Sequence, residues 1–182
     1  TQEITFLIEN EGELLIKAGR SKFKLPCLSG TEFSSFDTNI KEYSFTIKAS
    51  ALVYLFEHTK HAISPGEIRG YLNGAFFHAV DNSNNQSGQN DQDEQSTTKK
   101  IMRVVATDGF RFASTEADFE IGENFGLLVP RRTVGELLKL LDGIDSEILV
   151  RILADHNRIM FSLPDSTLVS KVIDATFPDY SE

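Results

Sequence analysis

The fold of this chain is decided by residues 125–143, FGLLVPRRTVGELLKLLDG, where a short apolar run leads into an amphipathic segment. Residues 125–129 are rich in apolar side chains and predict a strand. Pro130 follows at a place that the first turn of a helix tolerates. Asp142-Gly143 is a typical helix end. Between them, four apolar residues at helical spacing predict one buried stripe: Val134, Leu137, Leu138 and Leu141.

The same order of elements occurs upstream. Residues 43–47, YSFTI, carry apolar side chains at alternate positions and predict a strand. Ser50 is then the expected cap of a helix that runs to about Ile63, where Pro65-Gly66 stops it. Five residues of this helix fall on one stripe and are expected to be buried: Leu52, Leu55, Phe56, Thr59 and Ile63.

Three strand-like runs follow each helix. After the first helix they are residues 68–80, 101–106 and 110–114, and after the second they are 147–153, 158–163 and 168–173. The chain therefore contains the order β-α-β-β-β twice. Each half has one apolar helix stripe, so two helices lying side by side can cover one face of a curved antiparallel sheet. We predict an α+β fold with a pseudo-twofold repeat.

Two further segments lie outside this repeat. Residues 4–9 and 14–17 flank a turn and predict a hairpin, residues 22–25 predict a third strand, and the small polar residues of 29–41 predict a linker. Residues 81–100 contain no apolar side chain and predict a flexible insertion that joins two strands. A neutral insertion is favoured over a partner-binding arm.

Composition excludes several classes of protein. The chain has 182 residues, 40% of them apolar, which is typical of a globular protein with one full domain. No run of about 18 apolar residues occurs, so no membrane span is expected. The start at Thr1 has no signal-peptide pattern and no Met, which favours a piece of a longer protein. Cys27 is alone and fits a reducing cytosol. The net charge of −9 argues against electrostatic binding of nucleic acid unless one face is locally positive.

Signatures of catalysis are missing from the sequence. There is no glycine-rich phosphate loop. His58 and His61, beside Glu57, could share a metal ion, but the solvated face of a helix is the favoured interpretation. His78 and His156 have no partner at suitable spacing. No nucleophile, base and oxyanion donor come together, so we predict no catalytic residue, no metal and no cofactor.

Short motifs in a fixed order carry a resemblance. RGYLNG at 69–74, VATDGFRFA at 105–113 and FPDY at 177–180, together with VPRR at 129–132, resemble the middle domain of the bacterial DNA polymerase III beta subunit, the replication sliding clamp. The resemblance implies a DNA-clamp fold. It assigns residues 41–182 to the middle clamp domain and residues 1–40 to the end of the first domain and a linker.

The resemblance implies a non-catalytic processivity factor in the cytoplasm. In the full-length protein, two chains close head-to-tail into a homodimeric ring around double-stranded DNA. Such a ring is retained by topology, so an acidic outer face is compatible with a modestly positive lining. The expected DNA-facing residues are Arg131, Arg132 and Lys139, with Lys60 a weaker candidate because Glu57 offsets it. Their contacts should go to phosphates and be independent of base sequence.

A peptide-binding pocket is the second property that the resemblance implies. It would tether DNA polymerase subunits, the clamp loader and repair proteins through short linear motifs. The residues at the matching positions are Arg69, Tyr71, Leu72, Thr107, Gly109, Phe110, Arg111, Phe112 and Pro178. Leu72 and Phe112 could equally be core residues.

The sequence also departs from the family pattern. Phe110 and Phe112 stand where the family commonly has His and Leu, which predicts a more apolar pocket. Gly70 replaces an aromatic residue, and Glu182 stands near positions that are often basic. Two other interpretations stay open. One is a domain of an enzyme whose active site lies outside this sequence, and the other is a structural domain without DNA loading.

Overall fold

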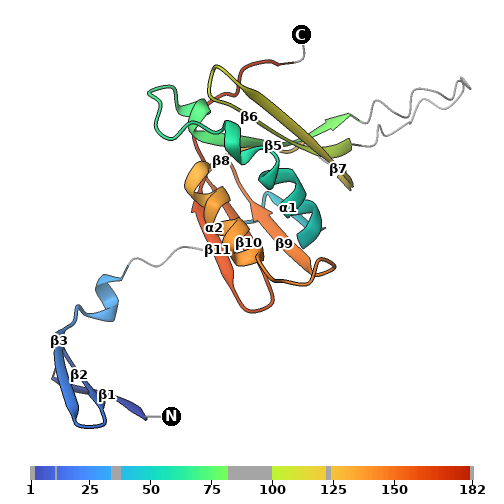
Figure 1. The fold of residues 1–182 in the computed structure, drawn as a ribbon. Coiled ribbons are helices and arrows are strands. Elements are labelled where there is room, and N and C mark those ends of the chain that lie inside the picture. The colour runs from blue at the N-terminus through green and yellow to red at the C-terminus, as the bar shows by residue number, and fades with distance from the viewer. Residues whose placement is uncertain (1–2, 11, 34–37, 82–99, 122–123, 181–182) are drawn as a thin grey trace, which may run out of the picture. The chain divides into compact units, whose positions relative to one another are not determined.

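The computed structural model describes residues 3–10, 12–33, 38–81, 100–121 and 124–180, which belong to two compact units, Thr1–Asp37 and Thr38–Glu182 (Figure 1). The first unit contains an antiparallel sheet in the order β1-β2-β3, as the hairpin pattern predicted. Its elements are β1 (Ile4–Asn10), β2 (Glu13–Ala18), β3 (Ser21–Pro26) and the 3-10 turn η1 (Gly30–Glu32). Residues 82–99 of the predicted insertion and Glu182 lie outside the described residues.

The second unit consists of two four-stranded antiparallel sheets and two α-helices. The sheet orders are β11-β10-β9-β4 and β7-β6-β5-β8. The strands are β4 (Tyr43–Lys48), β5 (Gly74–Asp81), β6 (Lys100–Thr107), β7 (Phe112–Ile121), β8 (Gly126–Pro130), β9 (Leu149–Ala154), β10 (Arg158–Ser162) and β11 (Thr167–Lys171).

The two halves of the repeat exchange their first strands. β4, from the first half, pairs with β9 of the second half, with Phe45 opposite Ile152. β8, from the second half, pairs with β5 of the first half, with Phe76 opposite Leu128. The predicted doubled order of elements is therefore confirmed, and the expected curved sheet is divided into two sheets, each completed by a strand from the other half.

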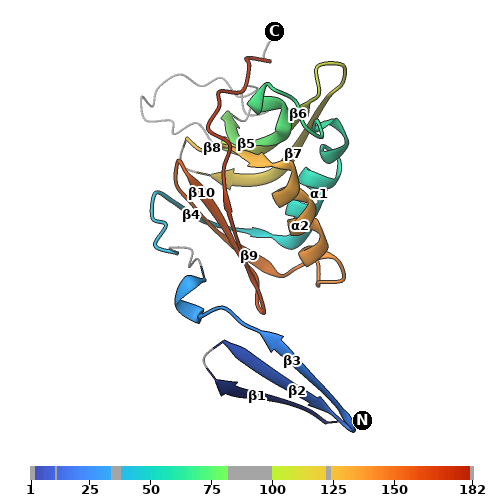
Figure 2. The same cartoon turned by 90° about the vertical axis from the view of Figure 1, so that its left-hand side faces the viewer.

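Both helices cover the inner faces of these sheets and lie next to each other (Figures 1 and 2). They are α1 (Ala49–Glu57) and α2 (Arg131–Leu141). The predicted stripe of the first helix is buried throughout, and Leu137 in the second is fully buried. Leu138 is only half-buried, because it packs against the core on one side and lines the space between the helices on the other. These helix residues thus belong to one apolar core between the helices and the sheets.

The first helix is shorter than predicted. It ends at Glu57 rather than near Ile63, and a 3-10 turn, η2 (Lys60–Ala62), follows. The buried Thr59 hydroxyl donates a hydrogen bond to the carbonyl of Leu55 at 2.9 Å. In a continuing α-helix, the Leu55 carbonyl would accept a hydrogen bond from the backbone N–H of Thr59. Because the Thr59 hydroxyl bonds to this carbonyl instead, the helix can end here.

Ser50 does not cap this helix, which corrects the sequence prediction. The N-cap is Lys48, whose side chain makes no capping bond. The first helical amides bond instead to the loop before β9: Ala49 N–H donates to the Ile148 carbonyl at 2.8 Å and Ser50 N–H to the Ser146 carbonyl at 3.2 Å. Because backbone carbonyls satisfy these amides, no side-chain cap is needed.

Two predicted strands begin later than expected. In place of a strand over residues 68–73 there is a loop and a 3-10 turn, η3 (Gly70–Asn73). The Asn73 side chain bonds both the N–H and the carbonyl of Glu67, which closes the loop. β7 begins at Phe112 rather than at Phe110 and continues to Ile121, beyond the predicted end at Ser114. In both places, hydrogen bonds between side chains and the backbone stabilise a turn, so no strand pairing forms there.

Candidate peptide site and helix face

The outer face of the β7-β6-β5-β8 sheet carries a second apolar cluster. Along β5 and β6, Phe77 and Val104 point into the core, while Phe76 and Val105 point outward. Val105, Leu128 and Phe177 form the centre of this outer cluster. Phe177 comes from residues 172–180, here termed the C-terminal segment, which continues from β11 past β8 and β5 (Figure 2).

The C-terminal segment is attached to the sheet by its backbone and by an aromatic ring. Ile173 N–H donates to the Leu128 carbonyl at 2.9 Å. The Phe177 ring stacks on Phe76, with centroids 5.3 Å apart, and meets the edge of Tyr71 at 6.4 Å. The motif segments 69–74 and 177–180 of the predicted peptide site therefore lie in contact.

The second predicted segment forms a tight turn between β6 and β7. The Asp108 carboxylate accepts bonds from the backbone N–H groups of Phe110 at 3.0 Å and Arg111 at 2.8 Å, and it pairs with the Arg111 guanidinium. These bonds lower the pKa of Asp108 to about 2. The Thr107 hydroxyl donates to the Arg111 carbonyl at 2.7 Å and accepts from Gly109 N–H. Thr107 and Arg111 thus shape the turn in the free protein.

Arg69 connects the first segment to this turn. Gly109 has φ +88°, a conformation that favours glycine, and a Cβ there would lie 3.5 Å from Nη2 of Arg69. The Phe112 ring lies 5.4 Å from that of Tyr180 in the C-terminal segment. All three predicted segments are therefore adjacent in space.

Exposure divides the predicted peptide-site residues into two groups. Phe110 is 98% exposed and Phe112 is 51% exposed, and Pro178 is also exposed. Leu72 is only 1% exposed, so its side chain belongs to the core in this state. The apolar surface open to a partner is formed by Phe110, Phe112 and Pro178, with Tyr180 beside them.

A polar network on the same face was missed by the sequence analysis. His78 is 7% exposed and lies at hydrogen-bond distance from the Tyr180 hydroxyl, 2.5 Å from Nε2. Arg103 Nη1 donates to the same hydroxyl at 3.2 Å, and its Nε donates to Glu116 at 2.8 Å. His78 therefore has a partner after all, but that partner is 102 residues away in sequence, which local spacing could not reveal.

Burial is the main cause that lowers the pKa of His78 to about 4; the positive charge of Arg103 acts in the same direction, and the hydrogen bond to the Phe76 carbonyl acts in the opposite one. Between this pKa and the ordinary value of 6.5, the unfolded chain binds more protons than the folded chain. The free energy of unfolding should thus fall as the pH drops from 6.5 towards 4, by up to about 3 kcal/mol. Urea unfolding at several pH values would measure this loss.

The control for this prediction is His78→Gln, which cannot titrate in this range and should flatten the pH profile. His61→Gln, at an exposed position, should leave the slope as in the wild type. Equal slopes in the wild type and His78→Gln would contradict the assignment.

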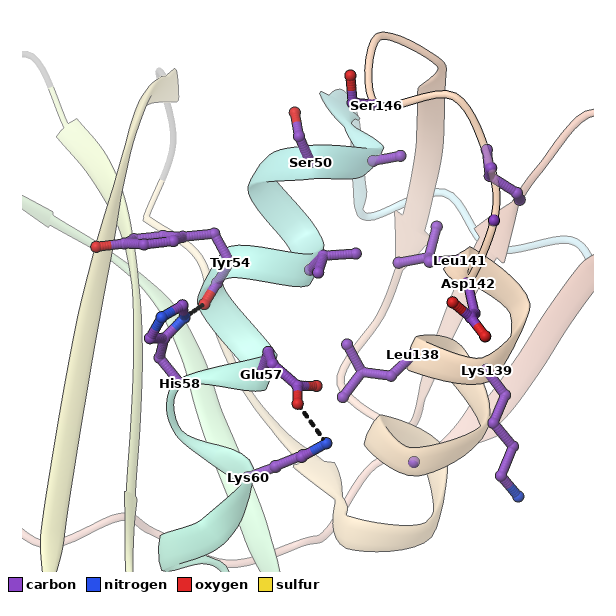
Figure 3. A pocket seen from close by; sticks show the side chains of 15 residues that line it. Ser50, Tyr54, Glu57, His58, Lys60, Leu138, Lys139, Leu141, Asp142 and Ser146 are labelled. Carbon is purple, nitrogen blue, oxygen red and sulfur yellow. Dashed lines mark hydrogen bonds and ion pairs between the residues drawn. The ribbon is translucent and has the colours of Figure 1, made fainter.

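The helices form a separate surface on the other side of the sheets. A groove of about 940 Å³ runs between α1 and α2, with Val53, Leu138 and Gly135 in its lining (Figure 3). Lys60 and Lys139 also line it, each paired with a carboxylate one turn earlier: Lys60 with Glu57 at 2.6 Å and Lys139 with Glu136 at 3.2 Å.

The arginines at the start of α2 differ from each other. Arg131 Nη1 donates to the Ile63 carbonyl at 2.9 Å, which ties α2 to the end of the η2 turn. Arg132 is exposed. Of the two, Arg131 thus has a structural role as well as a charge.

Metal sites and membrane-spanning helices are two further classes of feature. In the described part of the chain, no group of three or more His, Cys, Asp or Glu residues could hold a metal ion, so His58 and His61 do not form part of such a cluster. The same residues include no helix that is both long and apolar enough to cross a bilayer.

Comparisons with known proteins agree with this geometry. Residues 93–179 match the family model described as DNA polymerase III beta subunit, central domain. The beta sliding clamps of Proteus mirabilis and Escherichia coli K12 are 33% and 32% identical over 177 residues, which is 95% of this chain and 42% of each relative. The crystal structure of the Bartonella birtlesii sliding clamp bound to griselimycin is 34% identical, with a TM-score of 0.81, over 99% of this chain and 44% of that one.

The chain has paired helices on two sheets that exchange strands. Solved clamp structures match this arrangement over nearly the whole chain, so the protein has the DNA-clamp fold. Over 95% of its length the chain is similar to bacterial beta sliding clamps, and residues 93–179 match the central domain of the DNA polymerase III beta subunit. The chain spans 42% of the length of the curated relatives named above.

Proposed function

We propose that this chain is part of a non-catalytic sliding clamp, which encircles duplex DNA in the bacterial cytoplasm and tethers replication and repair proteins. Residues 41–182 would be its middle domain and residues 1–40 the end of its first domain and a linker. One observation carries the proposal. The three motif segments converge on the outer face of one sheet, while the paired helices occupy the opposite face.

The outer face has the chemistry of a site for short peptides. Phe110, Phe112 and Pro178 offer apolar surface, and Arg69 lies next to the same turn. Such a surface would take the hydrophobic anchors of an extended motif from a polymerase subunit, the clamp loader or a repair protein. The Bartonella birtlesii clamp, which binds griselimycin, supports ligand binding by this fold. Leu72 is buried and would not contact the peptide in this state.

The helix face has the chemistry of a loose contact with DNA. Arg131, Arg132, Lys139 and Lys60 all lie on α2 or η2, although the chain as a whole has a net charge of −9. A ring formed by a head-to-tail homodimer of the complete protein would hold DNA by enclosure, so a few phosphate contacts suffice. The ion pairs of Lys60 and Lys139 reduce the charge that they offer.

An enzyme domain with its active site elsewhere is not favoured, because relatives that match 95% of this chain are themselves named beta sliding clamps. Peptide binding separates the two functions. A labelled peptide of the Gln-x-x-Leu-Phe type should bind the chain in fluorescence anisotropy. An absence of binding would count against the clamp.

Replacing Phe110 with alanine should weaken binding of this peptide by about 1–2 kcal/mol, because the exposed ring is the most accessible apolar anchor. Pro178→Ala should act in the same direction. Titrations of both variants against the wild type would measure the loss. The matched control is Phe33→Ala, which truncates an 84% exposed phenylalanine in the first unit and should bind as the wild type does. Unchanged affinity in both test variants would place the site elsewhere.

A further inference from the structure

Three charged or polar residues form a row across the outer face of the β7-β6-β5-β8 sheet. His78 on β5 lies opposite Arg103 on β6, and Arg103 lies opposite Glu116 on β7. On the other side of His78, β8 places Gly126, where a Cβ would come within 3.2 Å of the Phe76 ring. The glycine thus leaves room for Phe76 and His78 to stack at 4.2 Å.

Tyr180 lies over this row and completes its hydrogen bonds. The Phe76 carbonyl can only accept, so Nδ1 of the neutral His78 carries the proton and donates to it at 3.2 Å. Nε2 is then an acceptor, and the Tyr180 hydroxyl donates to it. The same hydroxyl oxygen accepts from Arg103, whose charge Glu116 balances. The imidazole, the phenol and the guanidinium are therefore joined in one network, in which the phenol O–H has a single acceptor, Nε2 of His78.

The phenol ring is also part of the aromatic surface of the candidate peptide site. Its centroid lies 5.4 Å from that of Phe112 and 6.1 Å from that of Phe177, and the Arg103 guanidinium lies 5.9 Å from it. Pro178 lies between Phe177 and Tyr180 in sequence. Phe177 is stacked on Phe76, and the Tyr180 hydroxyl is hydrogen-bonded to His78 and Arg103. Because both residues are fixed, the position of Pro178 between them is fixed as well.

We propose that His78, Arg103 and Glu116 form a latch for the Tyr180 hydroxyl, and that these residues position Phe112 and Pro178 as the wall of the peptide site. They act through Tyr180 and need not touch the peptide. The second part of this inference rests on the proposed peptide-binding function, whereas the latch itself does not.

The test uses the whole chain and the variant Tyr180→Phe, which removes the hydroxyl and keeps the ring. Binding of the labelled Gln-x-x-Leu-Phe peptide is expected to weaken roughly three- to tenfold, the effect of losing one or two hydrogen bonds. Tyr54→Phe, which removes a hydroxyl from the helix face, is the matched control and should bind as the wild type does. His78→Leu should reproduce the loss, and His78→Gln, whose amide oxygen can accept from the phenol, should restore affinity to within about twofold.

A spectroscopic measurement tests the latch without any peptide. In ¹⁵N NMR spectra of the imidazole groups, His78 should show a protonated Nδ1 and a hydrogen-bonded, unprotonated Nε2, and only the Nε2 shift should change strongly in Tyr180→Phe. Limited proteolysis should cut the C-terminal segment faster in this variant. A His78 spectrum that is identical in the wild type and Tyr180→Phe would overturn the latch.

The Tyr180 latch and its positioning role in the peptide site can be refuted separately. If the His78 signal changes but peptide affinity does not, the latch exists and its role in the site is refuted. If the wild type itself binds no peptide, the proposed function fails and with it the positioning role, while the NMR result still decides the latch.

Discussion

Replacing Phe77 with alanine is expected to lower the free energy of unfolding of the Thr38–Glu182 unit by about 4 kcal/mol. Phe77 is fully buried, and its ring packs near three others. The distances between ring centroids are 6.3 Å to Phe45, 5.4 Å to Phe56 and 5.1 Å to Phe125. Phe77 therefore connects β4, α1 and the residue before β8. Truncation removes contacts with both halves of the repeat at once and leaves a cavity that the sheets cannot close.

Urea unfolding followed by circular dichroism would measure this change. Phe110→Ala is the matched control, because it removes the same atoms from a side chain that is 98% exposed. Its free energy of unfolding should stay within about 0.5 kcal/mol of the wild type. Similar losses in the two variants would show that Phe77 is not the centre of the core.

Reversing two charges on the helix face should greatly shorten the time that the complete ring stays on DNA. In the complete protein that carries this chain, the double variant Arg132→Glu and Lys139→Glu is expected to leave closed circular duplex on the order of tenfold faster at low salt. The negative side chains would repel phosphates inside the ring. The difference should shrink as salt is added, because salt screens both the attraction and the repulsion.

The design of this experiment follows from the contacts of the charged residues. Arg131 is left unchanged, because its bond to the Ile63 carbonyl would make a loss of stability look like a loss of DNA contact. The control reverses two exposed lysines that belong to neither helix, Lys41→Glu and Lys171→Glu, and so changes the net charge by the same amount. If test and control variants leave DNA at the same rate, the helix face does not contact the duplex.

Local periodicity was sufficient to predict the elements that bury one stripe. Leu52, Leu55 and Leu137 were all placed correctly in the core, because burial of a helix face imposes its period on the sequence. The exchange of β4 and β8 could not be predicted, since strand partners far apart leave no local pattern. Ser50 was misassigned for the same reason: the carbonyls that satisfy its helix come from residues 146 and 148.

The candidate peptide site was predictable only as a set of motifs. The motif segments at 69–74, 105–113 and 177–180 do lie together, and this adjacency agrees with the family resemblance. The sequence did not indicate which side chains face solvent, so Leu72 could not be separated from Phe110. Nor could it pair His78 with Tyr180, because neither residue carries a signal of its own. The roles of the individual residues in binding stay predictions.

The strand exchange also has a consequence for biosynthesis. Tyr43 at the start of β4 pairs with Ala154 at the end of β9, so β4 has no partner until most of the unit has left the ribosome. Until then, its apolar face and the emerging β5–β7 strands are open to aggregation. We expect the nascent chain to depend on chaperones until β9 is synthesised, and to complete folding in one late step.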